Sequence, residues 1–258
     1  MISNKFITTT LALFLGASIY AQEVETQETI DFSADRPGAS TGTDITGKYK
    51  LMFETGFGFE RDLYEGADSK TYTLNTSLLR FGLSDNAELR FQIDEQTQEE
   101  DGESVSGICP MIVGSKLKIF DGYKAIPKIG LLCNLVLPTG KSEFKSDYVS
   151  PQIYLLFDNE LTDKLSLGYN VGGEWDGNTA NATTFAAICL GYSITDKFGA
   201  FIENYDYFHS EHKPVWLTEF GVSWQVAPRV QVDLAGDLNL KCPDKNYAIS
   251  FGLAWLIN

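Results

Sequence analysis

The sequence has few of the residues on which most enzymes depend. Among its 258 residues are two histidines, His209 and His212, and four cysteines. The cysteine spacings match no zinc motif, and no glycine-rich phosphate loop or nucleotide fingerprint is present. We therefore expect no cofactor, no metal site and no enzymatic activity.

Long apolar runs are also missing after Tyr20. The longest later stretch, residues 126–137, is interrupted by Pro127, Lys128 and Asn134. A membrane-spanning helix needs about 20 consecutive apolar residues. A membrane protein with this sequence must therefore cross the bilayer with β-strands.

Basic side chains are in deficit, with 20 lysines and arginines against 35 acidic residues and a formal net charge of −15. This balance argues against nucleic acid or anionic lipid surfaces as principal partners, although solubility explains it equally well. Only 8 prolines stand beside 23 glycines and 13% aromatic residues, a composition typical of many short strands joined by tight turns.

The N-terminus has the features of a secretory signal peptide over residues 1–21. Lys5 supplies the positive charge, an apolar run extends to Tyr20, and Ala21 is a suitable cleavage residue. A retained helical anchor is disfavoured, because about ten apolar residues are too few to cross the bilayer core. Residues 22–48 form a polar leader with a compact charged turn at Asp35, Arg36 and Pro37. This leader either extends into the periplasm or folds into the lumen as a partial plug.

From Tyr49 to the end, residues 49–258, the chain alternates between apolar and polar residues. Phe53 and Phe57 share one face of the first such segment, while Glu54 and Glu60 share the other. The same period of two returns in residues 165–174, 216–225 and 247–255, which indicates β-strands. One face is apolar and aromatic, and the other is polar or very small.

Turn signals divide this region into twelve predicted strands. Short turns are expected at residues 84–86, 121–122, 162–164, 195–197 and 227–229, and longer loops at 62–70, 95–104, 139–147, 176–181, 209–214 and 239–245. The five short turns and six longer loops alternate strictly, and both ends of the region lie on the short-turn side. This arrangement is typical of a transmembrane antiparallel β-barrel with short periplasmic turns and longer external loops.

The aromatic residues favour this barrel over a secreted sandwich or jelly roll, because they gather near the strand ends. Those near the longer loops are Tyr72, Tyr148, Trp175, Tyr205, Tyr207, Trp216 and Tyr247; those near the short turns or chain ends are Tyr49, Phe81, Phe120, Tyr123, Tyr192, Phe198, Trp224 and Trp255. Two such belts are expected at the two interfaces of a membrane barrel.

Several short motifs occur in an order that resembles a known family. They are Asp35-Arg36-Pro37-Gly38, Phe53-Glu54-Thr55-Gly56-Phe57, Leu79-Arg80-Phe81-Gly82-Leu83-Ser84-Asp85 with Glu88-Leu89-Arg90, Leu137-Pro138-Thr139-Gly140, Leu165-Ser166-Leu167-Gly168-Tyr169-Asn170 and Glu203. The chain resembles the outer-membrane family labelled meta-pathway of phenol degradation. The resemblance implies an outer-membrane barrel of the transporter type, and no substrate is carried over from the label.

If the apolar faces meet lipid, the charged residues of the opposite faces line the lumen. The predicted lumen-lining residues are Glu54, Arg80, Glu88, Arg90, Lys116, Lys118, Glu174, Glu203, Glu219 and Asp233. Such charges either form structural salt bridges that brace or block the lumen, or set the selectivity of a polar path.

Three other groups of residues are candidates for chemistry. The acidic run over residues 95–103 either is a solvated loop or binds divalent cations that bridge lipopolysaccharide. His209-Ser210-Glu211-His212 is the only candidate for a catalytic site, but neighbouring residues of an extended chain point to opposite sides. Cys109, Cys133, Cys189 and Cys242 are interpreted as small apolar fillers rather than a disulfide framework.

The sequence thus predicts an outer-membrane barrel that acts as a passive channel or transporter for small solutes. A barrel with a closed lumen, serving a structural or surface-interaction role, is the alternative, and an outer-membrane lipid enzyme is the least favoured hypothesis. The expected partners are outer-membrane lipid and lipopolysaccharide, the barrel assembly machinery and an unidentified small solute, with no nucleic acid.

Overall fold

A computed structural model describes residues 32–64, 67–208, 216–240 and 246–258. The predicted signal peptide, His209, His212 and Cys242 lie outside the described residues. Within the described part of the chain, no helix is long and apolar enough to cross a membrane.

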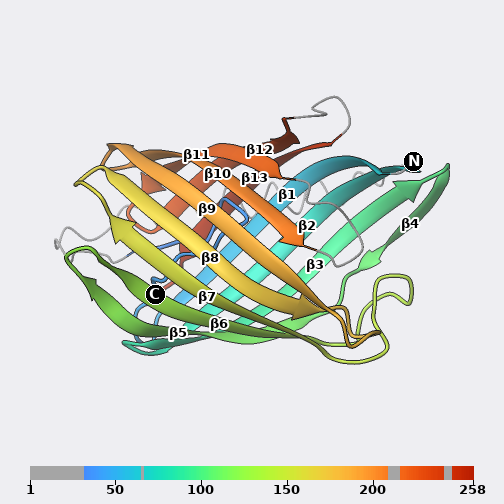
Figure 1. The fold of residues 1–258 in the computed structure, drawn as a ribbon, viewed down its shortest axis with the longest axis horizontal. Coiled ribbons are helices and arrows are strands. Elements are labelled where there is room, and N and C mark those ends of the chain that lie inside the picture. Colours follow the sequence, from blue (N-terminus) through green and yellow to red (C-terminus); the bar gives the residue numbers. More distant parts are fainter. Residues whose placement is uncertain (1–31, 65–66, 209–215, 241–245) are drawn as a thin grey trace. The chain divides into compact units, whose positions relative to one another are not determined.

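The described chain forms one antiparallel β-barrel (Figure 1). Its strands are β1 (Leu51–Tyr64), β2 (Ala67–Ser84), β3 (Ala87–Glu100), β4 (Glu103–Ile108), β5 (Ile112–Tyr123), β6 (Ile126–Val136), β7 (Ser150–Glu160), β8 (Leu165–Trp175), β9 (Ala182–Thr195), β10 (Phe198–Phe208), β11 (Leu217–Ala227), β12 (Val230–Asn239) and β13 (Tyr247–Leu256). Each strand pairs with the next along the chain, except that β5 pairs with β3 instead of β4, and β1 pairs with β13 to close the cylinder. The short β4 pairs only with β3, so the closed barrel has the twelve strands predicted from the turns.

Alternation along each strand separates an inner from an outer face. On β12 and β13, Ala235 and Ala254 point inward and are 3% and 0% exposed, whereas Leu234 and Trp255 point outward and are 47% and 41% exposed. Large apolar side chains therefore cover the outside of the barrel. That outer face is suited to lipid, and the buried residues lie inside the barrel.

Two of the predicted loops are strands instead. Residues 62–70 are almost entirely paired, because β1 and β2 continue to Tyr64 and from Ala67, and Arg61 forms an ion pair with Asp68 at 2.8 Å between Nε and Oδ1. The predicted loop at 95–104 is the β3–β4 hairpin, whose turn has positive φ values at Asp101 and Gly102. Polar side chains are compatible with strands beyond the apolar band. The polar residues at 62–70 and 95–104 therefore indicate where these strands leave the apolar band, and the strands themselves continue further.

The turn predicted at 121–122 lies three residues later. Strand β5 extends to Tyr123, and the reversal occurs at Lys124 and Ala125, with a positive φ of 56° at Lys124. Gly122 also has a positive φ, of 79°, close to an irregularity in the pairing of β5 with β6. A glycine in that conformation within a strand resembles a turn in the sequence, which explains the shifted prediction.

The aromatic belt near the longer loops includes two residues that were wrongly assigned to it. Tyr205 and Tyr207 lie on the same face of β10 as Glu203 and therefore point inward. The Tyr205 hydroxyl donates to Asp237 at 3.1 Å, and the Tyr207 ring lies 5.0 Å from the ring of Phe185, a buried residue. Strand periodicity thus overrides the tendency of tyrosine to lie at the lipid interface.

Candidate functional site

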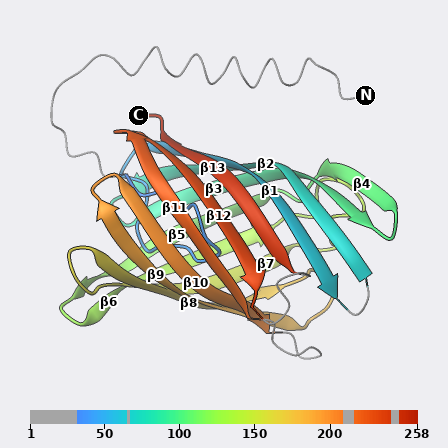
Figure 2. The same ribbon diagram turned by 90° about the horizontal axis from the view of Figure 1, so that it is seen from above.

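Residues 32–50, here called the lumen segment, run inside the barrel before β1 begins (Figures 1 and 2). The segment leaves the lumen along β2, where the Tyr49 amide donates to the Gly82 carbonyl at 2.7 Å and the Gly82 amide donates to the Lys50 carbonyl at 3.0 Å. A Cβ added at Gly82 would lie 2.1 Å from the Gly47 carbonyl oxygen. Glycine is therefore required where the segment passes over this strand.

Side-chain acceptors on the barrel wall bind the backbone amides of the lumen segment. Glu54 accepts from the amides of Asp35 and Arg36, Glu219 from Ala39, Glu203 from Ser40, Asn170 from Thr41, Asp158 from Thr43 and Glu88 from Thr46, over distances of 2.6 to 3.1 Å. The acceptors come from six strands, namely β1, β3, β7, β8, β10 and β11. A buried backbone amide needs a partner, and carboxylates make the stronger kind of hydrogen bond. The wall therefore holds the segment by its main chain.

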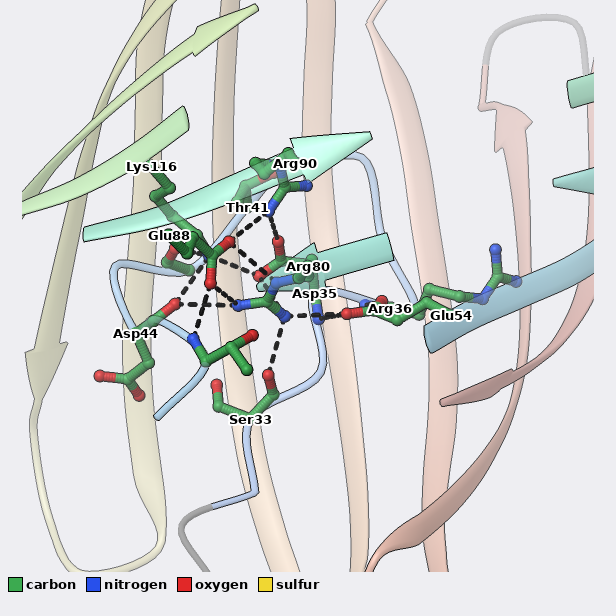
Figure 3. A network of polar contacts seen from close by, with 12 residues as sticks. Ser33, Asp35, Arg36, Thr41, Asp44, Glu54, Arg80, Glu88, Arg90 and Lys116 are labelled. Atoms are coloured by element: carbon green, nitrogen blue, oxygen red, sulfur yellow. Dashed lines mark hydrogen bonds and ion pairs between the residues drawn. The ribbon is translucent and has the colours of Figure 1, made fainter. Parts of the chain in front are cut away.

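Three cations of the wall converge on the carboxylate of Asp35 (Figure 3). Lys116 Nζ lies 2.7 Å and Arg80 Nη1 3.4 Å from Asp35 Oδ1, and Arg90 Nη1 donates to Oδ2. The side chains of Arg80 and Lys116 are fully buried. Removing one partner of a buried ion pair commonly costs about 3–5 kcal/mol. Asp35 is therefore the electrostatic anchor of the segment.

The Lys116 ammonium group uses its hydrogen bonds on the lumen segment. Besides Asp35, it donates to the carbonyl oxygens of Gly42 at 3.1 Å and Asp44 at 2.7 Å. The nearest wall carboxylate, Glu88, is 3.9 Å away and is engaged by Arg80 through two parallel contacts of 2.9 and 3.0 Å. An ammonium group has three donors. All three serve the segment, so its departure would leave Lys116 without them.

The wall contains two like-charged pairs on neighbouring strands. Arg80 of β2 lies opposite Arg90 of β3, and Glu203 of β10 lies opposite Glu219 of β11. Like charges directly opposite each other destabilise a sheet. Asp35 lies against the arginine pair, and the amides of Ala39 and Ser40 donate to the glutamate pair. The lumen segment thus supplies a compensating group to each pair.

Arg36 occupies space left free by two inward-facing glycines. A Cβ added at Gly56 or Gly252 would lie 2.6 or 2.1 Å from atoms of the Arg36 guanidinium. Arg36 Nη2 forms an ion pair with Asp233 Oδ1 at 3.3 Å, and its carbonyl oxygen accepts from Gln231 at 3.0 Å. The shape of the wall is therefore complementary to this side chain.

Asp35 stays ionised despite its burial. Burial alone would raise the pKa of its carboxyl group, but Arg80, Lys116 and Arg90 together hold that pKa well below the usual range. The ionised form is the one that pairs with all three cations. The anchor is therefore charged at neutral pH.

Eight of the ten predicted lumen-lining residues contact the lumen segment. Glu54, Arg80, Glu88, Arg90, Lys116, Glu203, Glu219 and Asp233 do so. The other two have partners elsewhere: Lys118 forms an ion pair with Asp121 at 2.7 Å, and Glu174 accepts from Tyr154 at 2.7 Å.

Sequence analysis did not identify two residues that lie at the binding surface of the lumen segment. Asp158 shares the inward face of β7 with Gln152, which alternation could have indicated. Cys189, interpreted as a filler, lies directly opposite Glu203, the residue that accepts from the amide and hydroxyl of Ser40. No local pattern identifies this site, because Ser40 and Glu203 are 163 positions apart.

The described residues contain no further reactive centre of a recognisable kind. Cys109, Cys133 and Cys189 are free thiols. Burial, together with Asp94 and Glu95, raises the pKa of the Cys109 thiol to about 11, so this group is protonated at neutral pH. Among the described residues, no three His, Cys, Asp or Glu side chains are grouped to hold a metal ion.

Comparison with protein families gives a match over most of the chain. The model of the family described as "Putative MetA-pathway of phenol degradation" matches residues 34–257. The match begins inside the lumen segment, at the residue before Asp35. Comparison with curated protein sequences gives no match.

Solved structures similar to this chain are outer-membrane barrels. An outer membrane channel from Pseudomonas putida F1 has a TM-score of 0.69 at 12% identity, over 86% of this chain and 99% of that one. The KdgM porin, in complex with disordered oligogalacturonate, has a TM-score of 0.57 at 9% identity, over 80% and 99%. The translocator domain of the autotransporter NalP from Neisseria meningitidis has a TM-score of 0.51 at 12% identity, over 96% of both chains. At these identities the likeness shows the fold alone.

Replacing a wall acceptor should loosen the lumen segment. In Glu203→Ala, the amide and hydroxyl of Ser40 both lose their acceptor. We expect backbone amides around Ser40 to exchange with deuterium about tenfold faster or more, since an unpaired buried donor costs about 1–3 kcal/mol. Hydrogen exchange with mass spectrometry measures this. Glu100→Ala, on the exposed β3–β4 hairpin, is the matched control. Equal exchange in both variants would contradict the contact of Glu203 with the lumen segment.

The charge on Asp35 should persist in mild acid. Because its pKa is lowered in the folded protein, ionised Asp35 stabilises the seated segment above its ordinary pKa of about 3.9. That contribution disappears only as the pH falls below this value and through the lowered one. We expect its ¹³C carboxyl resonance to stay constant from neutral pH to about pH 4.5. A midpoint at or above the ordinary value would show that the three cations do not contact it.

Proposed function

The chain belongs to the family described as "Putative MetA-pathway of phenol degradation", and from this membership and its barrel fold we propose that it is a channel of the outer membrane. In this proposal it passes small solutes passively, and the lumen segment closes it at rest. The outer face contacts membrane lipid and lipopolysaccharide, and the barrel assembly machinery inserts the protein. No covalent chemistry is involved.

The observation that carries this proposal is that the barrel wall contains two pairs of like-charged residues on neighbouring strands. Arg80 opposite Arg90 and Glu203 opposite Glu219 would each be unfavourable in a lumen that lacks both the lumen segment and water. Water or a solute would compensate them equally well if the segment moved. Such a wall fits a lumen that alternates between a filled and a hydrated state.

The bonds that hold the segment are numerous but exchangeable. Each amide-to-carboxylate hydrogen bond can be replaced by bonds to water, so its net contribution is only about 1–3 kcal/mol. Moving the segment breaks no covalent bond and no pairing between neighbouring strands of the barrel wall. It breaks only the backbone contacts of the segment with Gly82 of β2 and its side-chain contacts with the wall. Opening therefore leaves the barrel intact.

A permanently closed barrel is the second candidate, and one observation favours it. Arg80 is completely buried between Glu54, at 2.8 Å, and Glu88, at 2.9 Å. A network of this kind braces three neighbouring strands, β1, β2 and β3, of a barrel whose diameter is small enough to be filled by side chains. In that case the protein acts through its external loops, and the lumen segment never leaves.

A disulfide that fixes the lumen segment distinguishes the two functions. In Ser40→Cys, the new thiol would lie near the native Cys189 of β9, because the Ser40 hydroxyl contacts Glu203, which is paired directly with Cys189. We expect oxidation to join the two and to abolish channel openings, and reduction to restore them, because only a mobile segment can unblock the lumen. Single-channel recording of purified protein in a planar bilayer measures this, with mass spectrometry to verify the bond.

The matched control is the double variant Ser40→Cys, Cys189→Ala, which has the same new thiol and no partner for it. Its openings should not respond to oxidant. Openings that persist in verified cross-linked Ser40→Cys protein would contradict closure by the segment. If neither protein shows channel openings under reducing conditions, the permanently closed barrel is favoured.

A further inference from the structure

The carboxylate of Asp35 occupies a site that the barrel wall builds without it. Arg80, Arg90 and Lys116 come from β2, β3 and β5, and all three point at one place in the lumen (Figure 3). The wall holds Arg80 and Arg90, because Glu88 accepts from both and lies on the same strand as Arg90, and the register of β3 with β5 places Lys116 directly opposite Glu88. The strand register therefore brings the three cations together when the segment is absent.

Charge balance shows what this site requires. The wall places three cations, Arg80, Arg90 and Lys116, against two carboxylates, Glu54 and Glu88, which leaves one positive charge. Asp35 contributes the one negative charge that makes the cluster neutral. An occupant that replaces it must carry a single negative charge at this point.

The geometry of the donors restricts the occupant to a planar anion with two acceptor oxygens. Lys116 and Arg80 form ion pairs with Oδ1 of Asp35, and Arg90 forms one with Oδ2. Guanidinium groups match a carboxylate in this way, whereas a spherical ion such as chloride presents no second oxygen. A carboxylate is thus the group that the site recognises.

The remainder of the lumen limits the rest of the occupant. Once the segment has left, Asp233 loses Arg36, while Glu203 and Glu219 lose the amides of Ser40 and Ala39. These acidic groups repel a second negative charge and accept hydrogen bonds from neutral donors. A monocarboxylate therefore fits the lumen better than a dicarboxylate.

We propose that Arg80, Arg90 and Lys116 form the solute site of the channel, that its solutes are monocarboxylates, and that Asp35 is a built-in competitor for the same site. This proposal rests on the proposed channel function. A monocarboxylate that takes the place of Asp35 removes the anchor of the lumen segment and so opens the path for itself. The lumen segment is then an autoinhibitor that is released by the transported class of solute.

Hydrogen exchange of the lumen segment in the full-length protein tests this, with butyrate as the probe. We expect butyrate to speed the exchange of residues 35–46 in a saturable manner. Butyramide, which has nearly the same shape without the charge, and chloride at equal ionic strength should have no such effect. In Asp35→Asn the competitor has lost its charge, so the butyrate midpoint should fall by about tenfold or more.

Loss of a site cation provides the converse test. In Arg90→Gln the wall keeps two cations, Arg80 and Lys116, against the two carboxylates of Glu54 and Glu88. The cluster is then neutral without Asp35, and saturable butyrate release should disappear. Glu100→Gln, on the exposed β3–β4 hairpin, is the control and should respond as the unaltered protein does. Exchange that butyrate leaves unchanged in both the unaltered protein and Asp35→Asn would overturn the proposal, as would an equal effect of butyramide or chloride.

These results are separable from those on channel function. Exchange reports binding whether or not the barrel conducts, and conductance with the segment removed reports an open path whether or not butyrate binds. Butyrate release without conductance would therefore contradict the channel and retain the carboxylate site. Conductance without butyrate release would retain the channel and overturn the site.

Discussion

The arrangement of the lumen depends on one constraint: a charge that points into a narrow barrel needs a partner there. The register of β2 and β3 places Arg80 opposite Arg90, and Lys116 of β5 lies opposite Glu88. Three cations in so small a volume are unstable without anions between them. Glu54 and Glu88 supply two from the wall. The third, Asp35, comes from a segment that precedes the barrel in the chain.

The rest of the lumen follows from the position of Asp35. With this residue anchored, the main chain from Ala39 to Thr46 passes the inward carboxylates of the other strands. The amides of Ala39, Ser40, Thr43 and Thr46 each find a carboxylate acceptor there. Gly56, Gly252 and Gly82 lie where a larger side chain would collide with the segment. Small residues on the inner faces, which first appeared only as a feature of strand alternation, are therefore part of a binding surface for the segment.

Much of this architecture is predictable from the sequence, and the reasons are local. A period of two and regular turns are properties of neighbouring residues, so the twelve strands and the inward position of Glu54 or Arg80 followed from them. The two hairpins at residues 62–70 and 95–104 were missed because water-exposed strands lose the apolar half of the pattern. Tyr205 was misplaced because an aromatic ring suits both a lipid interface and a packed lumen.

The pairing of Asp35 with Arg80, Arg90 and Lys116 was beyond sequence analysis. Asp35 is separated from the three cations by 45 to 81 positions, and only the entry of the leader into the lumen brings it to them. Charge alone identified both the leader turn and the lumen residues, but it left open whether the leader enters the lumen. Contacts between a polar segment and a polar wall have no periodic signature, unlike the contacts of a strand or a helix with an apolar core.

The most direct test of the central claim, that residues 32–50 close an otherwise open barrel, is single-channel conductance with residues 32–47 removed. The account predicts steady, ohmic steps from the refolded shortened protein and only brief, rare openings from the full-length protein in the same bilayer. Silence from a shortened protein that is shown to be folded would contradict it, because the barrel wall itself would then close the lumen. Equal conductance of the two proteins would contradict it as well, because the segment would then block nothing.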